Sequence, residues 1–296
     1  MRINHNISSM VAQNAGRLQN QGLQKSLEKL STGLRINRAS DDAAGLSVSE
    51  QLRTQVRGLK QAQSNANDGI ALLQIAEGAA NEISAILQRM RELAIQSSND
   101  TLTTTERSYT DQEFQALMTE ISRISQATQY NGMTLLDGEE GSFGVSGGIS
   151  SVLHIGANNN NNDVAGTIDT MRVQLDAITL GALGLTLTQG ANGALGATAV
   201  TSQSAAFNAI DSIDTAIQSV NNMRSDMGAY INRLDHAINN IANQAFNTQD
   251  AESRIRDVDF ATETTTFTKR QILSQSATAM LSQANTLPQS VLQLLG

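Results

Sequence analysis

The feature that most constrains this chain is a seven-residue repeat of apolar side chains within residues 200–250. Its steps alternate between four and three, the spacing that keeps one face of an α-helix against a partner helix. The repeat comprises Ala206, Ile210, Ile213, Ile217, Val220, Met227, Ile231, Leu234, Ile238, Ile241 and Ala245, with Arg224 as its interruption. A helix of about 45 residues rises roughly 65–70 Å at 1.5 Å per residue. It therefore needs a partner of similar length.

A second repeat, upstream, predicts that partner. The heptad positions are Leu52, Leu59, Ala66, Leu73, Ala80, Leu87 and Ala94, and the positions between them include Val56, Ile70, Ala76, Ile83 and Met90. Alanine at a helix seam lets two helix axes approach closely. Asp41-Asp42 precede the first turn, where negative charge suits the helix dipole. We therefore expect a long, antiparallel, coiled-coil-like helical rod.

A shorter helix is expected to fold back on the first long one. Thr103 and Glu106 have the spacing of a capping box. Asn131-Gly132 supplies the left-handed stop that ends many helices. The apolar face between these two signals comprises Phe114, Leu117, Ile121, Ile124 and Tyr130.

Residues 133–196 favour strands and turns. Glycines collect here, and Asn158–Asn162 is a polar run between two short stretches with strand-like residues, Val152–Ile155 and Thr167–Leu175. In the second stretch Met171, Val173 and Leu175 alternate with polar side chains, which is the period of a strand. We expect a small β-hairpin region that caps the helices.

Both ends of the chain are predicted to be amphipathic helices. Their apolar positions are Ile3, Ile7, Leu23, Leu27, Leu30 and Leu34 near the N-terminus, and Phe267, Leu273, Met280, Leu281, Leu287, Val291 and Leu295 near the C-terminus. Chain ends are usually frayed, yet the C-terminal run LPQSVLQLLG is strongly apolar. Two such helices build little core by themselves. We therefore expect these apolar side chains to be buried against other copies of the chain.

The expected fold class is therefore mainly α, in three parts along the chain. Residues 1–40 form the N-terminal helix of a paired terminal-helix domain, and 256–296 form its C-terminal helix. Residues 41–255 form the helical rod, which includes the β-hairpin region at about 133–196. The charged stretches STGLRINRASDDAAG and DAESRIRDVD are suited to connecting the two parts.

Composition excludes several classes of function. The net charge of −8 argues against nucleic-acid binding, which needs a basic surface. No stretch approaches the ~20 apolar residues of a membrane-spanning helix. The chain has no cysteine, so it has neither disulfides nor thiolate metal sites, and its one proline, Pro288, leaves long helices unbroken.

Catalytic and cofactor motifs are not expected either. His5, His154 and His236 are scattered, and there is no H-E-x-x-H pair. The glycine-rich run GSFGVSGG at 141–148 lacks the lysine of a phosphate-binding loop and reads as a turn. We expect no enzyme activity, metal or cofactor. A coiled-coil adaptor, or an enzyme on a helical scaffold, remains the alternative from a different class.

Three long runs resemble the flagellin family. LEKLSTGLRINRASDDAAGLSVSEQLRTQVRGL is similar to its N-terminal signature, and NDGIALLQIAEGAANEISAILQRMRELAIQSSND to the helix that follows. SRIRDVDFATETTTFTKRQILSQSATAMLSQANTLPQSVLQLLG is similar to its C-terminus. The resemblance covers about two thirds of the chain. It implies a short flagellin with only the two inner domains, whose terminal helices pair and line the channel of the flagellar filament.

The resemblance also implies partners. These are other copies in a helical polymer, a chaperone on the C-terminal helix, and filament cap and junction proteins. The chain is also expected to be exported unfolded through the flagellar type III apparatus. The expected location is extracellular, in the flagellum. The alternative within the superfamily is the hook–filament junction protein, although NTLPQSVLQLLG is flagellin-like.

One further implied partner is the flagellin-sensing Toll-like receptor of vertebrates. Arg89, Leu93 and Glu113 match the pattern that it contacts in flagellins that it detects. Arg89 and Leu93 are four residues apart and therefore neighbours on one helix face. The alternative interpretation is that all three are ordinary surface and seam residues used in subunit packing.

Overall fold

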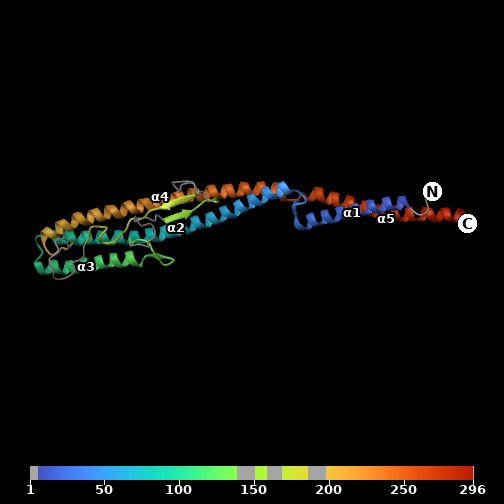
Figure 1. Cartoon of the computed structure of the whole chain (residues 1–296). Helices are drawn as coiled ribbons and strands as arrows, with labels where there is room; N and C mark the ends of the chain where they lie inside the picture. The colour runs from blue at the N-terminus through green and yellow to red at the C-terminus, as the bar shows by residue number, and fades with distance from the viewer. Residues whose placement is uncertain (1–5, 139–150, 159–168, 186–197, 296) are drawn as a thin grey trace. The chain divides into compact units, whose positions relative to one another are not determined.

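The computed structural model describes residues 6–138, 151–158, 169–185 and 198–295, which form helices and short antiparallel strand pairs (Figure 1). The chain divides into a terminal unit, Met1–Val56 with Phe246–Gly296, and a rod unit, Arg57–Ala245. The helices are α1 (Ile7–Thr32), α2 (Ala43–Ser98), α3 (Thr104–Ala127), α4 (Gln203–Arg256) and α5 (Phe260–Leu295). The strands are β1 (Gln129–Tyr130), β2 (Met133–Thr134), β3 (Ser151–His154) and β4 (Thr170–Val173). The mainly α fold class is confirmed.

The long helix predicted from the heptad repeat is α4, which has 54 residues. Its seam positions are buried or half-buried from Ala206 to Ala245. At the interruption, Met223 takes the inward position, and Arg224 turns aside toward Glu77 of α2, 4.0 Å away. The predicted seam is therefore confirmed, and the charged residue sits at its margin.

Its partner is α2, with 56 residues. The heptad positions from Leu59 to Ala94 are all buried. An ion pair between Arg91 and Asp214 joins an early turn of α4 to a late turn of α2, and Leu59 and Ala62 share a cluster with Ile241 and Ala245. The two helices of the rod unit therefore run antiparallel, as predicted.

Helix α3 folds back on α2, and its start is the predicted capping box. The Thr103 side chain accepts a hydrogen bond from the Glu106 backbone N–H, and the Glu106 carboxylate accepts one from the Thr103 N–H. The Thr103 N–H and the Thr103 hydroxyl, which both donate to the Glu106 carboxylate, lower the pKa of Glu106. Phe114, Met118 and Ile121 bury one face of α3 in the core shared with α2 and α4.

The prediction for Asn131-Gly132 is wrong. Helix α3 ends at Ala127 on an extended Thr128, and Tyr130 lies in β1 rather than on the helix. Asn131 and Gly132 form the two-residue turn between β1 and β2, with φ of 49° and 80°. Both a helix stop and a tight hairpin turn need left-handed backbone, so the same dipeptide serves either.

The hairpin predicted from the two strand-like stretches on either side of the asparagine run is present, but it does not cap the helices. Strand β3 pairs antiparallel with β4, and Met171 and Val173 face inward. The hairpin lies along the sides of α2 and α4 (Figure 1). A Cβ at Gly69 of α2 would lie 2.6 Å from Leu153 Cδ1, so the glycine makes room for β3. Part of the asparagine run and the glycine-rich run 141–148 lie outside the described residues.

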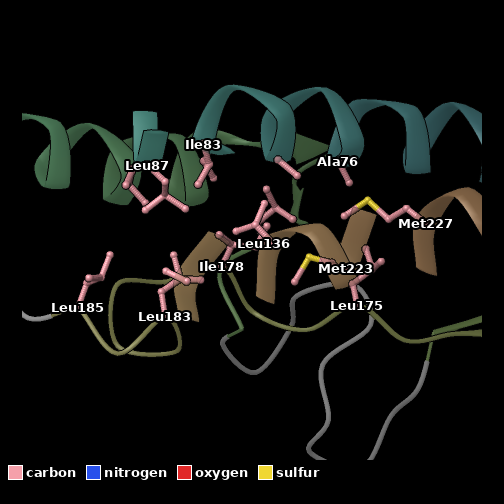
Figure 2. Packing of buried hydrophobic residues seen from close by; sticks show 14 of the residues in the cluster. Ala76, Ile83, Leu87, Leu136, Leu175, Ile178, Leu183, Leu185, Met223 and Met227 are labelled. Carbon is pink, nitrogen blue, oxygen red and sulfur yellow. The ribbon is translucent and has the colours of Figure 1, made fainter. Parts of the chain in front are cut away.

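A segment without regular structure completes the core of the rod. Leu175, Ile178, Leu183 and Leu185 are at most 5% exposed. Figure 2 shows them with Leu136 against Ala76, Ile83 and Leu87 of α2 and against Met223 and Met227 of α4. The Ile178 N–H donates to the Leu136 carbonyl at 2.9 Å, which joins the two coil segments. Leu175 belongs to the predicted period-two pattern, whereas no periodic pattern predicts the burial of Ile178, Leu183 and Leu185.

Helix α2 also contains a window that is long and apolar enough to cross a membrane, with mean hydropathy 1.3. This differs from the expectation that no such stretch exists. The window is 39% buried within the protein, and its apolar residues line the core of the rod. A buried core helix meets the same two criteria, so the window by itself is no evidence for a membrane span.

The connection between the terminal helices and the long ones is shorter than expected. Helix α4 continues to Arg256, so that most of DAESRIRDVD is helical. The chain after α1 pairs with the chain after α4: the Arg35 N–H donates to the Arg256 carbonyl at 2.7 Å, and the Val258 N–H donates to the Gly33 carbonyl at 3.0 Å. The Asp42 carboxylate accepts the Gly45 N–H at 2.8 Å and so caps the start of α2.

The predicted domain boundaries fall where helices end, and the compact units divide elsewhere. Boundaries at 40/41 and 255/256 lie close to the start of α2 and the end of α4. The units divide at 56/57 and 245/246, inside both helices. The division into three parts along the chain stays a prediction.

Candidate functional site

The two terminal helices are each capped by their own sequence. The Asn6 side chain accepts the Ser9 N–H at 3.2 Å at the start of α1, and Gly33, with φ of 72°, ends it. Asp259 caps α5: its carboxylate accepts the N–H groups of Ala261 and Thr262 at 3.0 and 3.3 Å, and the Thr262 hydroxyl at 2.7 Å. These hydrogen bonds hold the pKa of Asp259 below its usual value, with the Thr262 hydroxyl as the largest cause.

Helices α1 and α5 pair antiparallel. At one end of the pair the Asn6 side chain donates to the Ala284 carbonyl at 2.9 Å. In the middle Ser274 Oγ lies 2.7 Å from Asn20 Oδ1, and near the other end Arg270 donates to Ser26 Oγ at 3.2 Å. As the residue number on α1 rises, that of its partner on α5 falls. The predicted pairing of the terminal helices is therefore present.

The seam between these helices is made of small and polar side chains. Ser26 is the buried residue of α1, and Ala284 is buried on α5. At Gly16 a Cβ would lie 3.6 Å from the Ala277 Cβ, an ordinary contact. Large side chains are not needed to fill this seam, so the backbones approach closely.

Many of the large apolar side chains of α1 and α5 point outward instead. Ile7, Met10 and Met280 are each about 60% exposed. The exposed set comprises Ile7, Met10, Val11, Leu18 and Leu27 on α1 and Phe260, Ile272, Leu273 and Met280 on α5. We call these nine residues the outer apolar set. Exposed apolar side chains in such number mark a surface that another molecule covers.

A groove between the helices adjoins this set. It has a volume of about 660 Å³ and is lined by Met10 and Leu281 together with amide side chains such as Gln13, Asn14 and Gln21. Arg17 lies at its wall. The lining combines apolar contact area with amides that can fix the orientation of a bound group. Such a lining suits a side chain on a helix of another molecule better than a small ion.

The structure exposes only part of the predicted polymerisation residues. Ile7, Leu27, Leu273 and Met280 are exposed; Leu23, Leu30, Leu34, Phe267 and Leu281 are half-buried. Ile3 lies outside the described residues, as do the side chains of Leu287, Val291 and Leu295.

Sequence reasoning missed Val11, Leu18 and Ile272, which belong to the outer apolar set. Val11 and Leu18 are seven residues apart, and that spacing was available as a second stripe on α1. It also missed the small-residue seam, because glycine and serine inside a helix carry no periodic apolar signal.

The second predicted site is split between surface and core. Arg89 donates to Glu113 through Nε at 3.0 Å and through Nη2 at 2.9 Å, and through Nη1 to Glu92 at 3.0 Å. These bonds, led by Glu113, raise the pKa of Arg89. Leu93 is 2% exposed and packs in the core of the rod. Arg89 and Glu113 thus form a surface pair, whereas Leu93 is buried and not accessible to a partner.

Long helices that pair through small residues and hold large apolar residues outward define a class: structural α-helical proteins that associate with other helices. Among the described residues there is no group of three His, Cys, Asp or Glu side chains that could hold a metal ion. The arrangement is one of association surfaces.

Comparison with known proteins identifies the family. The model of the bacterial flagellin N-terminal helical region matches residues 3–140, and that of the bacterial flagellin C-terminal helical region matches residues 210–295. The chain is 47% identical to a flagellin of Halalkalibacterium halodurans and 44% identical to flagellin FlaB2 of Treponema pallidum, in both cases over the full length of both chains.

The chain belongs to the bacterial flagellin family. It is a structural subunit of the flagellar filament, which lies outside the cell. Its fold is also similar to that of a Vibrio parahaemolyticus protein assigned to the flagellar hook-associated class, with TM-score 0.55, 18% identity and coverage of 73% of this chain and 100% of the other. That likeness shows the fold alone, so nothing favours the junction-protein alternative.

Proposed function

We propose that the paired terminal helices are the surface through which this flagellin polymerises, and that the chain acts structurally, without catalysis. The observation that carries the proposal is where the side chains of these helices lie. Helices α1 and α5 contact each other through small residues, and the outer apolar set is exposed. Covering the exposed part of one such side chain with a neighbouring copy contributes about 1–2 kcal/mol, roughly half of the value for a fully exposed side chain. Several of them per subunit supply enough free energy for a stable polymer.

The groove between α1 and α5 makes the contacts between neighbouring copies directional. A polymer that grows without closing needs a surface on one copy that fits a different surface on the next. The outer apolar set provides protruding side chains, and the groove beside Met10 and Leu281 provides a recess of about 660 Å³. A side chain of one copy entering the groove of the next makes such a contact.

Removal of the terminal helices tests this proposal. A variant lacking residues 1–40 and 260–296 should keep a folded rod, because its core of α2, α3 and α4 residues lies outside the deletions. It should form no filaments by electron microscopy and should not sediment as polymer, whereas the full chain should do both. Filaments from the trimmed chain would contradict the proposal. The full chain also tests the junction alternative, since a junction protein should not form long filaments by itself.

We further propose that, before export, a dedicated chaperone covers α5. The exposed Ile272, Leu273 and Met280 form its target, the same surface that later contacts other copies. Export then proceeds unfolded through the type III apparatus, and growth at the tip proceeds beneath the cap protein. Deletion of 260–296 should abolish chaperone binding in a pull-down, while deletion of 1–40 should leave it intact. Equal loss in both variants would contradict the assignment to α5.

The vertebrate flagellin-sensing receptor remains a proposed partner of the rod. The accessible part of the proposed patch is the Arg89–Glu113 pair, whose side chains are 50% and 47% exposed. Arg89→Asp places a third carboxylate beside Glu92 and Glu113 and should weaken signalling in a reporter-cell assay. The matched control is Arg91→Asp, since Arg91 is also exposed and ion-paired, with Asp214. Full signalling by Arg89→Asp would remove this partner.

A further inference from the structure

Arg270 is a long charged side chain placed across a seam of small ones. Its guanidinium extends from α5 to α1, where Nη1 donates to the backbone carbonyl of Gly22 and to Ser26 Oγ, the latter at 3.2 Å. Ser26 is 1% exposed. A backbone carbonyl inside a helix has a second lone pair free for such a bond. The contact joins the two helices at one defined level.

Gly22 makes that contact possible. A Cβ at this position would lie 2.8 Å from Nη1 and 3.1 Å from Cζ of Arg270. Any larger residue therefore displaces the guanidinium from the carbonyl. At Gly16, by contrast, a Cβ would make only an ordinary contact with Ala277. The two glycines of the seam thus differ: one accommodates a specific side chain and the other only allows close approach.

A small-residue seam by itself sets the register of two helices weakly. Interlocking of large side chains is what normally penalises a slide of one helical turn. On α1 the seam contains Ser9, Gly16 and Ser26, and on α5 Ser274, Ala277 and Ala284. Small residues one turn apart offer similar surfaces, so a slide changes little packing. A slide breaks the neutral hydrogen bonds of Asn6 and Ser274 across the seam, and it also removes both partners of the part-buried, charged Arg270 guanidinium. The loss at Arg270 costs more, because hydrogen bonds to charged groups are the stronger ones.

We propose that Arg270 sets the register of α5 against α1, with Gly22 as the residue that admits it. By fixing the register, Arg270 aligns the outer apolar residues of the two helices into one surface for neighbouring copies. This role rests on the proposed function of the terminal pair in polymerisation. Arg270 is a positioning residue: it holds α5 in the same register against α1 in every copy, so that every copy presents the same apolar surface.

Disulfide trapping measures the register directly, because the natural chain has no cysteine. Disulfides need Cβ atoms about 3.5–4.5 Å apart, and the Gly16–Ala277 distance of 3.6 Å meets this. Gly16→Cys with Ala277→Cys therefore reports the observed register. Gly16→Cys with Ser274→Cys or with Leu281→Cys reports slides of about one turn in either direction. Each pair is oxidised in assembled filaments, and the bridged fraction is read on a denaturing gel.

In the parent background we expect the Gly16/Ala277 pair to bridge and the two offset pairs to bridge poorly. With Arg270→Gln, or with Gly22→Ala, the offset pairs should rise several-fold relative to the Gly16/Ala277 pair. Arg270→Lys keeps one donor for the Gly22 carbonyl and should restore most of the parent ratio. Lys269→Gln removes the neighbouring exposed charge on α5, and Lys25→Gln removes an exposed charge one turn after Gly22 on α1, outside the groove; both should leave the ratio unchanged.

An unchanged ratio in both Arg270→Gln and Gly22→Ala overturns the proposal, and so does an equal fall of all three bridged fractions, which indicates general loosening. Variants that do not assemble alone are carried into filaments as a minor component of the parent chain, where the same ratio is read. If the Gly16/Ala277 pair fails to bridge in parent filaments, the paired terminal helices themselves are contradicted. That result is distinguishable from a failure confined to Arg270.

Discussion

The rod unit and the terminal unit are both built from long paired helices, yet they place their large apolar residues on opposite sides. In the rod unit, Leu73, Leu87 and Met227 point inward and are shielded from water. In the terminal unit, Ile7, Met10 and others of the outer apolar set point away from the helix pair, and small residues fill the seam. The rod satisfies its hydrophobic surface within one chain, and the terminal pair does not.

This difference separates folding from assembly. A core of Leu, Ile, Met and Phe side chains stabilises the rod before any neighbour is present, because burial of apolar area is the main favourable contribution to folding. The terminal helices gain little from each other and depend on neighbours. Stability of the single chain and stability of the polymer therefore reside in different residues. Each can be weakened with little effect on the other.

The largest effect on folding should come from the rod core. Phe114 is fully buried among α2 and α4 residues, so Phe114→Ala should lower the free energy of unfolding by about 3–5 kcal/mol. The matched terminal change, Leu27→Ala, removes a side chain that is 53% exposed and should change monomer unfolding by no more than about 0.5 kcal/mol. Denaturant unfolding of monomers measures both. A large effect of Leu27→Ala on the monomer would break the comparison.

Assembly should show the reverse order. Ile272→Ser and Met280→Ser each remove a side chain of the outer apolar set, and each should raise the critical concentration for polymerisation about tenfold, the equivalent of about 1–2 kcal/mol per covered side chain. Monomer unfolding should not change. Sedimentation across a concentration series measures the effect. Thr265→Ser, an exposed polar change on the same helix, is the control, and an equal effect there would deny any special role to the apolar positions.

The comparison also explains what the sequence predicted well. In the rod, heptads such as Leu59, Ala66, Leu73 identify the buried face because a seam of large side chains is strongly periodic. The capping box at Thr103 was equally clear because it depends on residues three apart. Local and periodic signals are carried by the sequence itself.

The misses have a different origin. Asn131-Gly132 supplies left-handed backbone for a helix stop or a hairpin turn, and only the pairing of β1 with β2 decides between them. The coil residues Ile178, Leu183 and Leu185 join the core because they pack against α2 and α4, and such a tertiary contact leaves no periodic pattern in the sequence. On α1 the apolar positions Ile7 and Leu27 carry a periodic signal, whereas the seam with α5 carries none, since glycine and serine fill it.

A smaller effect is expected where α2 and α4 lie together in the terminal unit. Arg256 is 13% exposed and donates to Glu50 at 2.6 Å, and its Nε has no hydrogen-bond partner among the residues that the structure describes. Glu50→Ala should cost about 1 kcal/mol, because the guanidinium loses its carboxylate while Glu50, half-exposed, was already partly solvated. Faster amide hydrogen exchange at the start of α2 measures it. Gln51→Ala, at an exposed neighbour, should leave amide exchange unchanged. Equal exchange rates in the two variants would show that the Arg256–Glu50 ion pair does not stabilise the start of α2.

The smallest effect is a dependence on pH at the helix caps, and it sharpens the comparison of the two units. Asp259 caps α5 and Glu106 caps α3, and hydrogen bonds lower the pKa of both below their usual values of 3.8 and 4.5. A carboxyl group with a lowered pKa stabilises the folded state above its usual pKa, and that contribution is lost as the pH falls through the lowered value. The Asp259 cap should therefore weaken as the pH falls below about 3.8, and the Glu106 cap as it falls below about 4.5.

The consequences of losing these caps should differ. Helix α3 stays in place at low pH because Phe114, Met118 and Ile121 hold it in the core. The start of α5 has no comparable anchor, since Phe260 is 55% exposed, so its first turn should fray. Amide exchange at Thr262 should accelerate below pH 4, and at Glu106 much less. In Asp259→Asn the amide still caps the helix but does not titrate, so the acceleration at Thr262 should disappear. If it persists in that variant, the fraying has another cause than the Asp259 carboxyl group.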